Sequence, residues 1–455
     1  MAGDLALKAA TLLAVLAISV WLGMRFQGTV RVAGREDGAR GRANMHWNLI
    51  AFALIDGVRA SLGYTVFRFH AGQLGAPEWV TPVYLGGMMA MYGLASYGWG
   101  AAADRFGNRR MLLLIALGGI IATGLVMPFL PLTLFLAASL LQFGLTGIIR
   151  IPLALVSEWT AEQQGEGIGV LHATGWLLSA AFGVIAGDLY VEHGLGGVTL
   201  ISTVLYTLAL AAAWRLTGPS VAALASSRYG TSGQPSVEAG VVDGDSSAFE
   251  RLRRFLSFED RWVPWIIAVL MLVAIARGGI VLTALNYVES TGIDLDIVFV
   301  IEAWAMLLNV LLFAVGGILC DRFGAERVLA ASALLYMVVW CAFAIGLPPR
   351  LAVAAYVFPI AGLFYTAADA LLARHTSEDE RNRGLGVAGW AVFFGQFLGA
   401  MAATVIMYTL ASEGVTLWLT TYRIMAPLLI AGGVMSVWLA RRLSASQKSD
   451  AEPVL

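Results

Sequence analysis

Two arginines lie near the middle of long apolar segments, where an ionisable side chain is costly. Arg59 lies in the apolar stretch 47–69 and Arg277 in the stretch 262–287. An arginine at the centre of a membrane helix costs roughly 2.5–3.5 kcal/mol on insertion scales, so each needs a compensating role. A guanidinium group can bind a carboxylate or a phosphate through two parallel hydrogen bonds. We therefore interpret Arg59 and Arg277 as candidate ligands of an anionic substrate group.

Both arginines also have a structural interpretation, which the sequence leaves open. Asp56 is three residues before Arg59 and would face the same side of a helix, so it could neutralise Arg59 locally. Arg277 has no acidic residue within one helical turn, and its partner would be Glu302 or Asp369 from another segment. A buried ion pair with no role in binding is the alternative for both.

Further ionisable residues lie in the other apolar segments. Arg150 is a third candidate for substrate binding. Asp56, Glu302 and Asp369 are candidates for proton coupling, because protonation removes the charge that makes a buried carboxylate costly. We interpret His172, about two turns into its segment, as an interfacial histidine.

The segments that hold these residues are suited to a membrane. The chain is 59% hydrophobic and only 13% charged, whereas a soluble chain carries roughly 25% charged residues. Apolar runs of about 20 residues match a hydrocarbon core ~30 Å thick. We predict thirteen spans, at roughly 5–24, 47–69, 79–101, 110–130, 133–157, 167–190, 196–217, 262–287, 295–319, 327–347, 350–373, 384–411 and 418–440.

Several function classes find no support in the composition. The formal net charge of −1 does not favour a nucleic-acid partner. The chain has no Gly-x-x-x-x-Gly-Lys-Ser/Thr run, which disfavours a nucleotide-driven pump. We interpret its two cysteines, Cys320 and Cys341, as small apolar residues of the spans. We expect no enzyme activity, no metal and no cofactor.

An eleven-residue pattern occurs twice, each time between two apolar segments. The copies are Gly100-Ala-Ala-Ala-Asp-Arg-Phe-Gly-Asn-Arg-Arg110 and Gly317-Ile-Leu-Cys-Asp-Arg-Phe-Gly-Ala-Glu-Arg327. Their aspartates, Asp104 and Asp321, are 217 positions apart. The glycine of each copy would let two helices approach closely. The aspartate ends a helix where its carboxylate can face the N-terminus of a neighbouring helix.

The spacing of the two copies extends to other positions. The runs Gly167-Ile-Gly-Val and Gly384-Leu-Gly-Val are also 217 positions apart. Arg59 precedes the aspartate of its copy by 45 positions and Arg277 by 44. The chain is therefore an internal repeat of two halves in which the two arginines correspond.

The repeated pattern, Gly-x-x-x-Asp-Arg-x-Gly-x-x-Arg, resembles the signature loop of the major facilitator superfamily. In that family it joins helices 2 and 3 and, more weakly, helices 8 and 9. The resemblance covers about residues 47–443 and implies an all-α integral membrane protein with the major facilitator fold, in which two six-helix bundles alternate access to a site between them. Here one extra N-terminal transmembrane helix precedes them. Paired arginines at these positions resemble the organophosphate and organic-anion branch, where they clamp an anion from both halves.

The resemblance also assigns a role to the loop, which in the family latches the halves in one state of the cycle. It implies a latch in which Glu158 is the acid at the end of the fifth segment. The implied latch residues are Gly100, Asp104, Arg105, Gly107, Arg109, Glu158, Gly317, Asp321, Arg322, Gly324 and Arg327. The second copy departs by having Glu326 just before its final arginine. The alternative is that these residues only anchor loops at lipid headgroups.

The distribution of arginines predicts the orientation. Both signature loops and the stretch 25–46 are rich in arginine, which places them in the cytoplasm. Cleavage of segment 5–24 as a signal peptide would invert the orientation of every later span, so we expect this helix to be retained. We expect a multi-pass protein of the cell membrane, with its N-terminus outside the cell and its C-terminus in the cytoplasm. We interpret this helix as a lipid-facing anchor.

The expected organisation has five parts. They are the extra helix and an Arg-rich cytoplasmic loop (1–46), the N-terminal bundle (47–217), a polar cytoplasmic linker (218–260), the C-terminal bundle (261–443) and a cytoplasmic tail (444–455). We expect a monomeric, proton-coupled transporter of a small organic anion. The alternatives are proton-coupled efflux of a lipophilic or cationic compound and, from another class, a transporter-derived receptor or lipid flippase.

Overall fold

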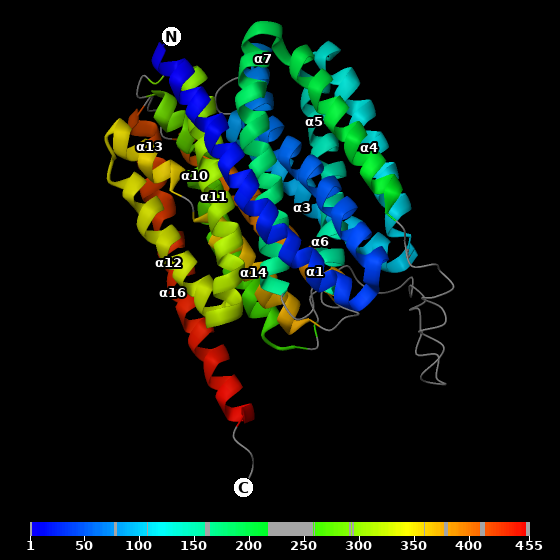
Figure 1. The fold of residues 1–455 in the computed structure, drawn as a ribbon. Coiled ribbons are helices and arrows are strands. Elements are labelled where there is room, and N and C mark those ends of the chain that lie inside the picture. Colours follow the sequence, from blue (N-terminus) through cyan, green and yellow to red (C-terminus); the bar gives the residue numbers. More distant parts are fainter. Residues whose placement is uncertain are drawn as a thin grey trace, which may run out of the picture.

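The computed structural model describes residues 2–76, 80–106, 108–159, 164–216, 258, 260–290, 293, 295–358, 360–376, 381–409 and 415–451, and within these residues the chain is helical without strands. Figure 1 shows the two halves side by side, the first in blue to green and the second in yellow to red. The predicted linker 218–260 lies outside the described residues except for 258 and 260.

The helices of the first half follow the predicted spans. They are α1 (Ala2–Ser61), α2 (Phe67–Gln73), α3 (Val80–Phe106), α4 (Arg109–Val126), α5 (Leu132–Thr146), α6 (Arg150–Trp159) and α7 (Gln164–Arg215). A π-helical turn (Leu62–Val66) joins α1 to α2, and short 3₁₀ turns (Met127–Phe129 and Gly147–Ile149) follow α4 and α5.

The second half repeats this layout. Its helices are α10 (Val263–Ser290), α11 (Leu295–Phe323), α12 (Ala325–Ala344), α13 (Pro349–Val357), α14 (Ala361–His375), α15 (Arg381–Thr409) and α16 (Val415–Ala451). Among the described residues, nine helical stretches are long and apolar enough to cross a membrane. The all-helical membrane fold that the sequence predicts is confirmed.

Two of the helical elements contain more than one predicted span. Gly194, with φ of +62°, breaks α7 between the predicted spans 167–190 and 196–217. The ribbon of α1 runs the length of the molecule and turns back (Figure 1), so that Ala14 and Ala60 pack in one cluster. The stretch 25–46, predicted as a loop, is assigned to helix. No proline occurs before Pro77, so nothing in its backbone forbids helix there.

The two halves meet along two pairs of helices. Helix α7 packs on α11 and α3 packs on α15. At the first seam an added Cβ on Gly169 would lie 2.5 Å from the carbonyl oxygen of Phe313. At the second, an added Cβ on Gly86 would lie 2.7 Å from the Cβ of Ala400. Small residues thus let the backbones of the two halves approach closely.

The N-terminal segment of α1 covers the first of these seams. Leu22 is buried in a cluster with Ala173 of α7 and Phe313 of α11. On the opposite face, Leu13 and Leu16 are exposed. The predicted lipid-facing anchor therefore has a second face, which packs on both halves at once.

We call the end of the molecule that holds both signature loops the motif side. Arg374, at the end of α14, forms an ion pair with Asp321 there, and Glu166, at the start of α7, contacts the same aspartate. The start of α1 and the end of α16 lie at opposite ends of the molecule, with α16 ending on the motif side (Figure 1).

Candidate functional site

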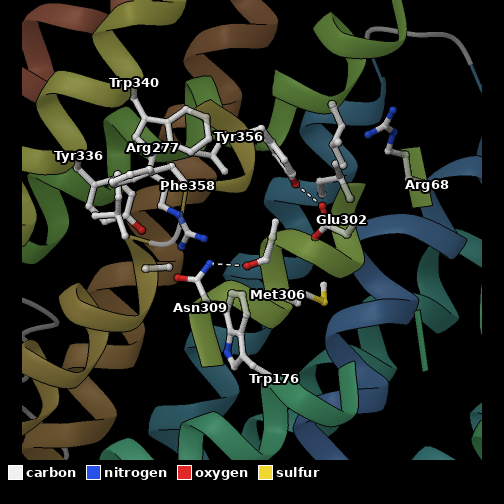
Figure 2. A pocket seen from close by; sticks show the side chains of 16 residues that line it. Arg68, Trp176, Arg277, Glu302, Met306, Asn309, Tyr336, Trp340, Tyr356 and Phe358 are labelled. Atoms are coloured by element: carbon white, nitrogen blue, oxygen red, sulfur yellow. Dashed lines mark hydrogen bonds between the residues drawn. The ribbon is translucent and has the colours of Figure 1, made fainter. Parts of the chain in front are cut away.

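A pocket lies between the two halves and is lined by residues of both (Figure 2). The first half contributes Arg68, Leu85 and Trp176. The second half contributes most of the lining, including Arg277, Glu302, Asn309, Tyr336, Trp340, Tyr356 and Phe358. Arg277 and Glu302 were predicted from the sequence as site residues, whereas Arg68 and the aromatic residues of the second half were not.

Two buried donors in the pocket lining lack an acceptor. Arg277 is 8% exposed, and its Cζ lies 5.2 Å from the centre of the Tyr365 ring. Its Nη1 finds no hydrogen-bond partner among the described residues, and neither does the indole Nε1 of Trp340. Buried polar groups are nearly always paired, so each unpaired one needs an explanation. An acceptor on a bound molecule would supply it.

Charged side chains of both signs line the pocket. Arg68 and Arg277 are cationic, and Glu302 is the carboxylate of the lining. Glu302 Oε2 accepts a hydrogen bond from the hydroxyl of Tyr356 (Figure 2). Arg277 is the cation of the lining whose Nη1 lacks an acceptor among the described residues, which favours an anionic ligand.

The pocket borders a break between α13 and α14. Phe358 has extended backbone (φ −62°, ψ 121°) and lines the pocket. Asn309 holds α11 against the start of α14, because its Oδ1 accepts from the backbone N–H of Gly362 at 2.8 Å. An added Cβ on Gly362 would lie 2.7 Å from the carbonyl oxygen of Asn309. Non-helical backbone at membrane depth is tolerated where it lines a cavity.

Arg59 lies outside this pocket lining in the present conformation. Its Nη2 and Nε donate to Oδ1 of Asp56 at 2.5 and 3.1 Å. The Arg59 Cζ also lies 4.5 Å from the centre of the Tyr92 ring. The local ion pair that the spacing of Asp56 and Arg59 suggests is therefore present. The role of Arg59 as a substrate ligand stays a prediction.

A second cluster of charged residues joins the halves on the motif side of the pocket. Asp369 of α14 lies 3.8 Å from Nη1 of Arg150 and 3.0 Å from Nε2 of His172. The side chains are only 9% (Asp369), 10% (Arg150) and 12% (His172) exposed. His172, interpreted from the sequence as an interfacial histidine, is mostly buried between the halves and contacts Asp369 there.

The sequence was compared with models of known protein families. The family model of the Major Facilitator Superfamily matches residues 43–319 and 278–454. The chain belongs to the major facilitator superfamily. Members of this family carry solutes across membranes, so its fold makes the protein a secondary transporter of a solute and a multi-pass membrane protein.

Solved structures of the superfamily share this fold at low sequence identity. The nucleoside transporter NupG superposes with a TM-score of 0.62 at 15% identity, over 87% of this chain and 99% of NupG. The human organic anion transporter MFSD10 (TETRAN) superposes with a TM-score of 0.61 at 14% identity, over 90% of this chain and 99% of MFSD10. The superfamily transporter FucP, in the outward conformation, superposes with a TM-score of 0.59 at 13% identity, over 87% of this chain and 98% of FucP. No curated protein matched the sequence.

The second superfamily loop makes direct contact with the opposite half. Asp321 Oδ2 accepts from the backbone N–H of Glu166 at 3.2 Å, in the first turn of α7. Its Oδ1 accepts from Nη2 of Arg374 at 3.0 Å. Gly324 has φ of +92° before α12, a conformation that favours glycine. Arg322 and Arg327 are exposed.

The first superfamily loop is described only in part. Gly107 and the side chains of Asp104, Arg105 and Glu158 lie outside the described residues. Gly100 is buried near the end of α3, and Arg109 is half-buried at the start of α4. The latch role of this copy therefore stays a prediction.

Proposed function

We propose that this protein transports a small organic anion, with Arg277 and Trp340 as its principal donors. The single observation that supports this most strongly is the pair of unpaired buried donors in one pocket lining. The anionic group would accept from Nη1 of Arg277 and from Nε1 of Trp340. Neither donor would then remain without a partner in a site of low dielectric.

The pocket lining supports a mechanism as well as a charge class. Arg68 and Trp176 belong to the first half, whereas Arg277 and Trp340 belong to the second. A ligand that contacts both sets would draw the halves together, and this is how binding would drive alternating access. The aromatic rings of the lining would hold the apolar part of the substrate.

The structural neighbours do not indicate which substrate this protein carries. Of the superposed transporters, one is named for nucleosides and one for organic anions, at 15% and 14% identity. The anionic class therefore rests on the pocket. Arg59 and Arg150 remain candidate ligands in another conformation of the cycle, because both lie buried in the first half.

We place the motif side in the cytoplasm of the cell, with the N-terminus outside, and treat the transporter as a monomer. The arginines of the two signature loops support this orientation. We also propose that transport is coupled to protons. Asp56, Glu302 and Asp369 are the buried carboxylates that could serve, and each has a cationic or hydroxyl partner.

The test is a thermal-shift screen of the purified protein in detergent. Carboxylates, phosphates and lipophilic cations would be compared, since a ligand at a hundred times its dissociation constant stabilises by about 2.7 kcal/mol. We expect a shift with one anion class. It should disappear in Arg277→Gln and weaken in Trp340→Phe, which removes the N–H and keeps an aromatic ring.

Matched control variants separate binding from folding. Arg350→Gln and Trp265→Phe make the same chemical changes at exposed residues outside the pocket lining, and both should keep the shift. A shift with cations alone, lost in Glu302→Gln, would overturn the anion proposal. It would favour the alternative, efflux of a lipophilic or cationic compound.

A further inference from the structure

We infer that His172 and Asp369 together form a proton-binding site between the halves, and that protonation of this site releases the motif side. The inference concerns the coupling ion and its gate. It rests on the alternating-access part of the proposed function and does not depend on the substrate being an anion.

The site is formed by residues of both halves. Asp369 Oδ2 lies 3.0 Å from Nε2 of His172, which belongs to α7. Asp369 Oδ1 lies 3.8 Å from Nη1 of Arg150, which belongs to α6. Any movement that separates the halves here must therefore break both contacts of Asp369.

The site lies between the pocket and the motif side. Asp369 is five residues before Arg374, or ~8 Å along α14, and His172 is six residues after Glu166, or ~9 Å along α7. Arg374 and Glu166 both contact Asp321 at the motif side. Asn309 of the pocket is twelve residues before Asp321, or ~18 Å along α11. Along the helix axes, the site therefore lies between the pocket and the motif side.

Neighbouring residues pack closely against His172 and Arg150, the two partners of Asp369. The imidazole of His172 stacks on Phe313 of the opposite half (5.1 Å between ring centres) and meets Phe52 edge-on (5.8 Å). The guanidinium of Arg150 lies against Gly389 of α15, where an added Cβ would be 2.6 Å from Nη2. A side chain at 389 would therefore displace the guanidinium of Arg150 from its present position across the seam.

Other charged groups near α14 are engaged elsewhere. From α10, Arg277 lies over the ring of Tyr365, one turn before Asp369. From α11, Glu302 bonds Tyr356 in the pocket, and Asp321 pairs with Arg374 at the end of α14. From α12, Tyr336 packs against Phe364, and the carboxylate of Glu326 lies close to where a Cβ on Gly324 would be. Within the described residues, the ion pairs of Asp369 are those with Arg150 and His172.

The charge balance of the site indicates how it would work. With Asp369 ionised and His172 neutral, the carboxylate and Arg150 cancel, and the closed motif side is stable. Parting the halves would then leave an ionised carboxylate without its partners at membrane depth, which is costly. In the proposed step, a proton taken from solvent forms an O–H bond on Asp369 before the halves separate. The carboxyl group is then neutral, and the halves can separate.

The experiment measures the conformation directly and needs no substrate. Spin labels would be placed at Met111→Cys on α4 and Ala445→Cys on α16, both exposed and on the motif side, in a Cys320→Ser, Cys341→Ser background. The distance between the labels would be measured in lipid nanodiscs between pH ~5 and ~8, the range over which histidine-based switches generally work.

We expect the long-distance population to grow as the pH falls, with the open-to-closed ratio changing by up to about tenfold per pH unit, the limit for one proton. Asp369→Asn should be open at every pH. His172→Gln, which keeps a neutral donor, should move the midpoint to lower pH. Gly389→Ala should favour the open form by displacing Arg150. Asp188→Asn, an exposed acid on α7, is the matched control and should respond like the parent.

A pH response that survives in Asp369→Asn would overturn the inference. If that response also disappears in Glu302→Gln, the proton site lies in the pocket instead. If Asp369→Asn does not fold, His172→Gln and Gly389→Ala still test the inference. A pH midpoint of opening that is unchanged in both variants would contradict the proposed proton site. Failure of the anion screen would leave this result unaffected.

Discussion

The carboxylate of Asp321, in the second half, accepts a hydrogen bond from the backbone N–H of Glu166, in the first turn of α7 of the first half. The first N–H groups of a helix have no partner within it and form its positive end. A single carboxylate of the repeated loop therefore joins the two halves of the transporter.

We expect Asp321→Asn to weaken this contact by about 1 kcal/mol, because a neutral amide oxygen is a poorer partner for a helix N-terminus and for Arg374. The spin-label pair at Met111 and Ala445 should show a larger open population at constant pH. Arg322→Gln, which neutralises the neighbouring exposed residue, is the control. Equal effects of the two variants would mean that the loop acts only through its overall charge.

Gly169→Ala tests the close approach of α7 and α11. The added Cβ would lie 2.5 Å from the carbonyl oxygen of Phe313, so the backbones must move apart. We expect a loss of about 1–3 kcal/mol in the free energy of unfolding, seen as a lower melting temperature in detergent. Gly183→Ala on the same helix meets only Ser61 Oγ at 3.6 Å and should have little effect. A wild-type melting temperature for Gly169→Ala would contradict the tight seam.

Removing one partner of the Asp56–Arg59 pair should cost more than removing both. Asp56→Asn leaves a buried guanidinium without its counter-charge, a change that typically costs about 3–5 kcal/mol. The double variant Asp56→Asn, Arg59→Gln should recover part of that loss in thermal melts. The charge-swapped pair Asp56→Arg, Arg59→Asp then addresses function. Transport restored in the swapped protein would show that Arg59 need not touch the substrate.

Leu22→Ala should destabilise the protein because Leu22 packs against both halves. Buried leucines truncated to alanine typically cost about 2 kcal/mol or more. Leu16→Ala, on the exposed face of the same helix, provides the matched control and should melt like the wild type. If both variants behaved alike, the N-terminal segment would act only as an anchor in the lipid.

Sequence patterns were sufficient for the fold class and the family, because both depend on local features. Apolar runs of membrane length and the repeated loop between them can be read along the chain without knowing any contact between helices. The charges of Arg277, Glu302 and Asp369 within spans could also be found this way, since their cost depends on depth alone.

Only the tertiary structure decided which of these charges meet. Arg68 lines the pocket, whereas Arg59, nine residues earlier, is paired with Asp56. His172 and Asp369 are 197 positions apart and lie on different halves. Such contacts depend on how each helix is rotated and which helices cross at the seam. The spacing of residues along the sequence cannot determine these contacts, because each contact also depends on side chains that the opposite half contributes to the seam.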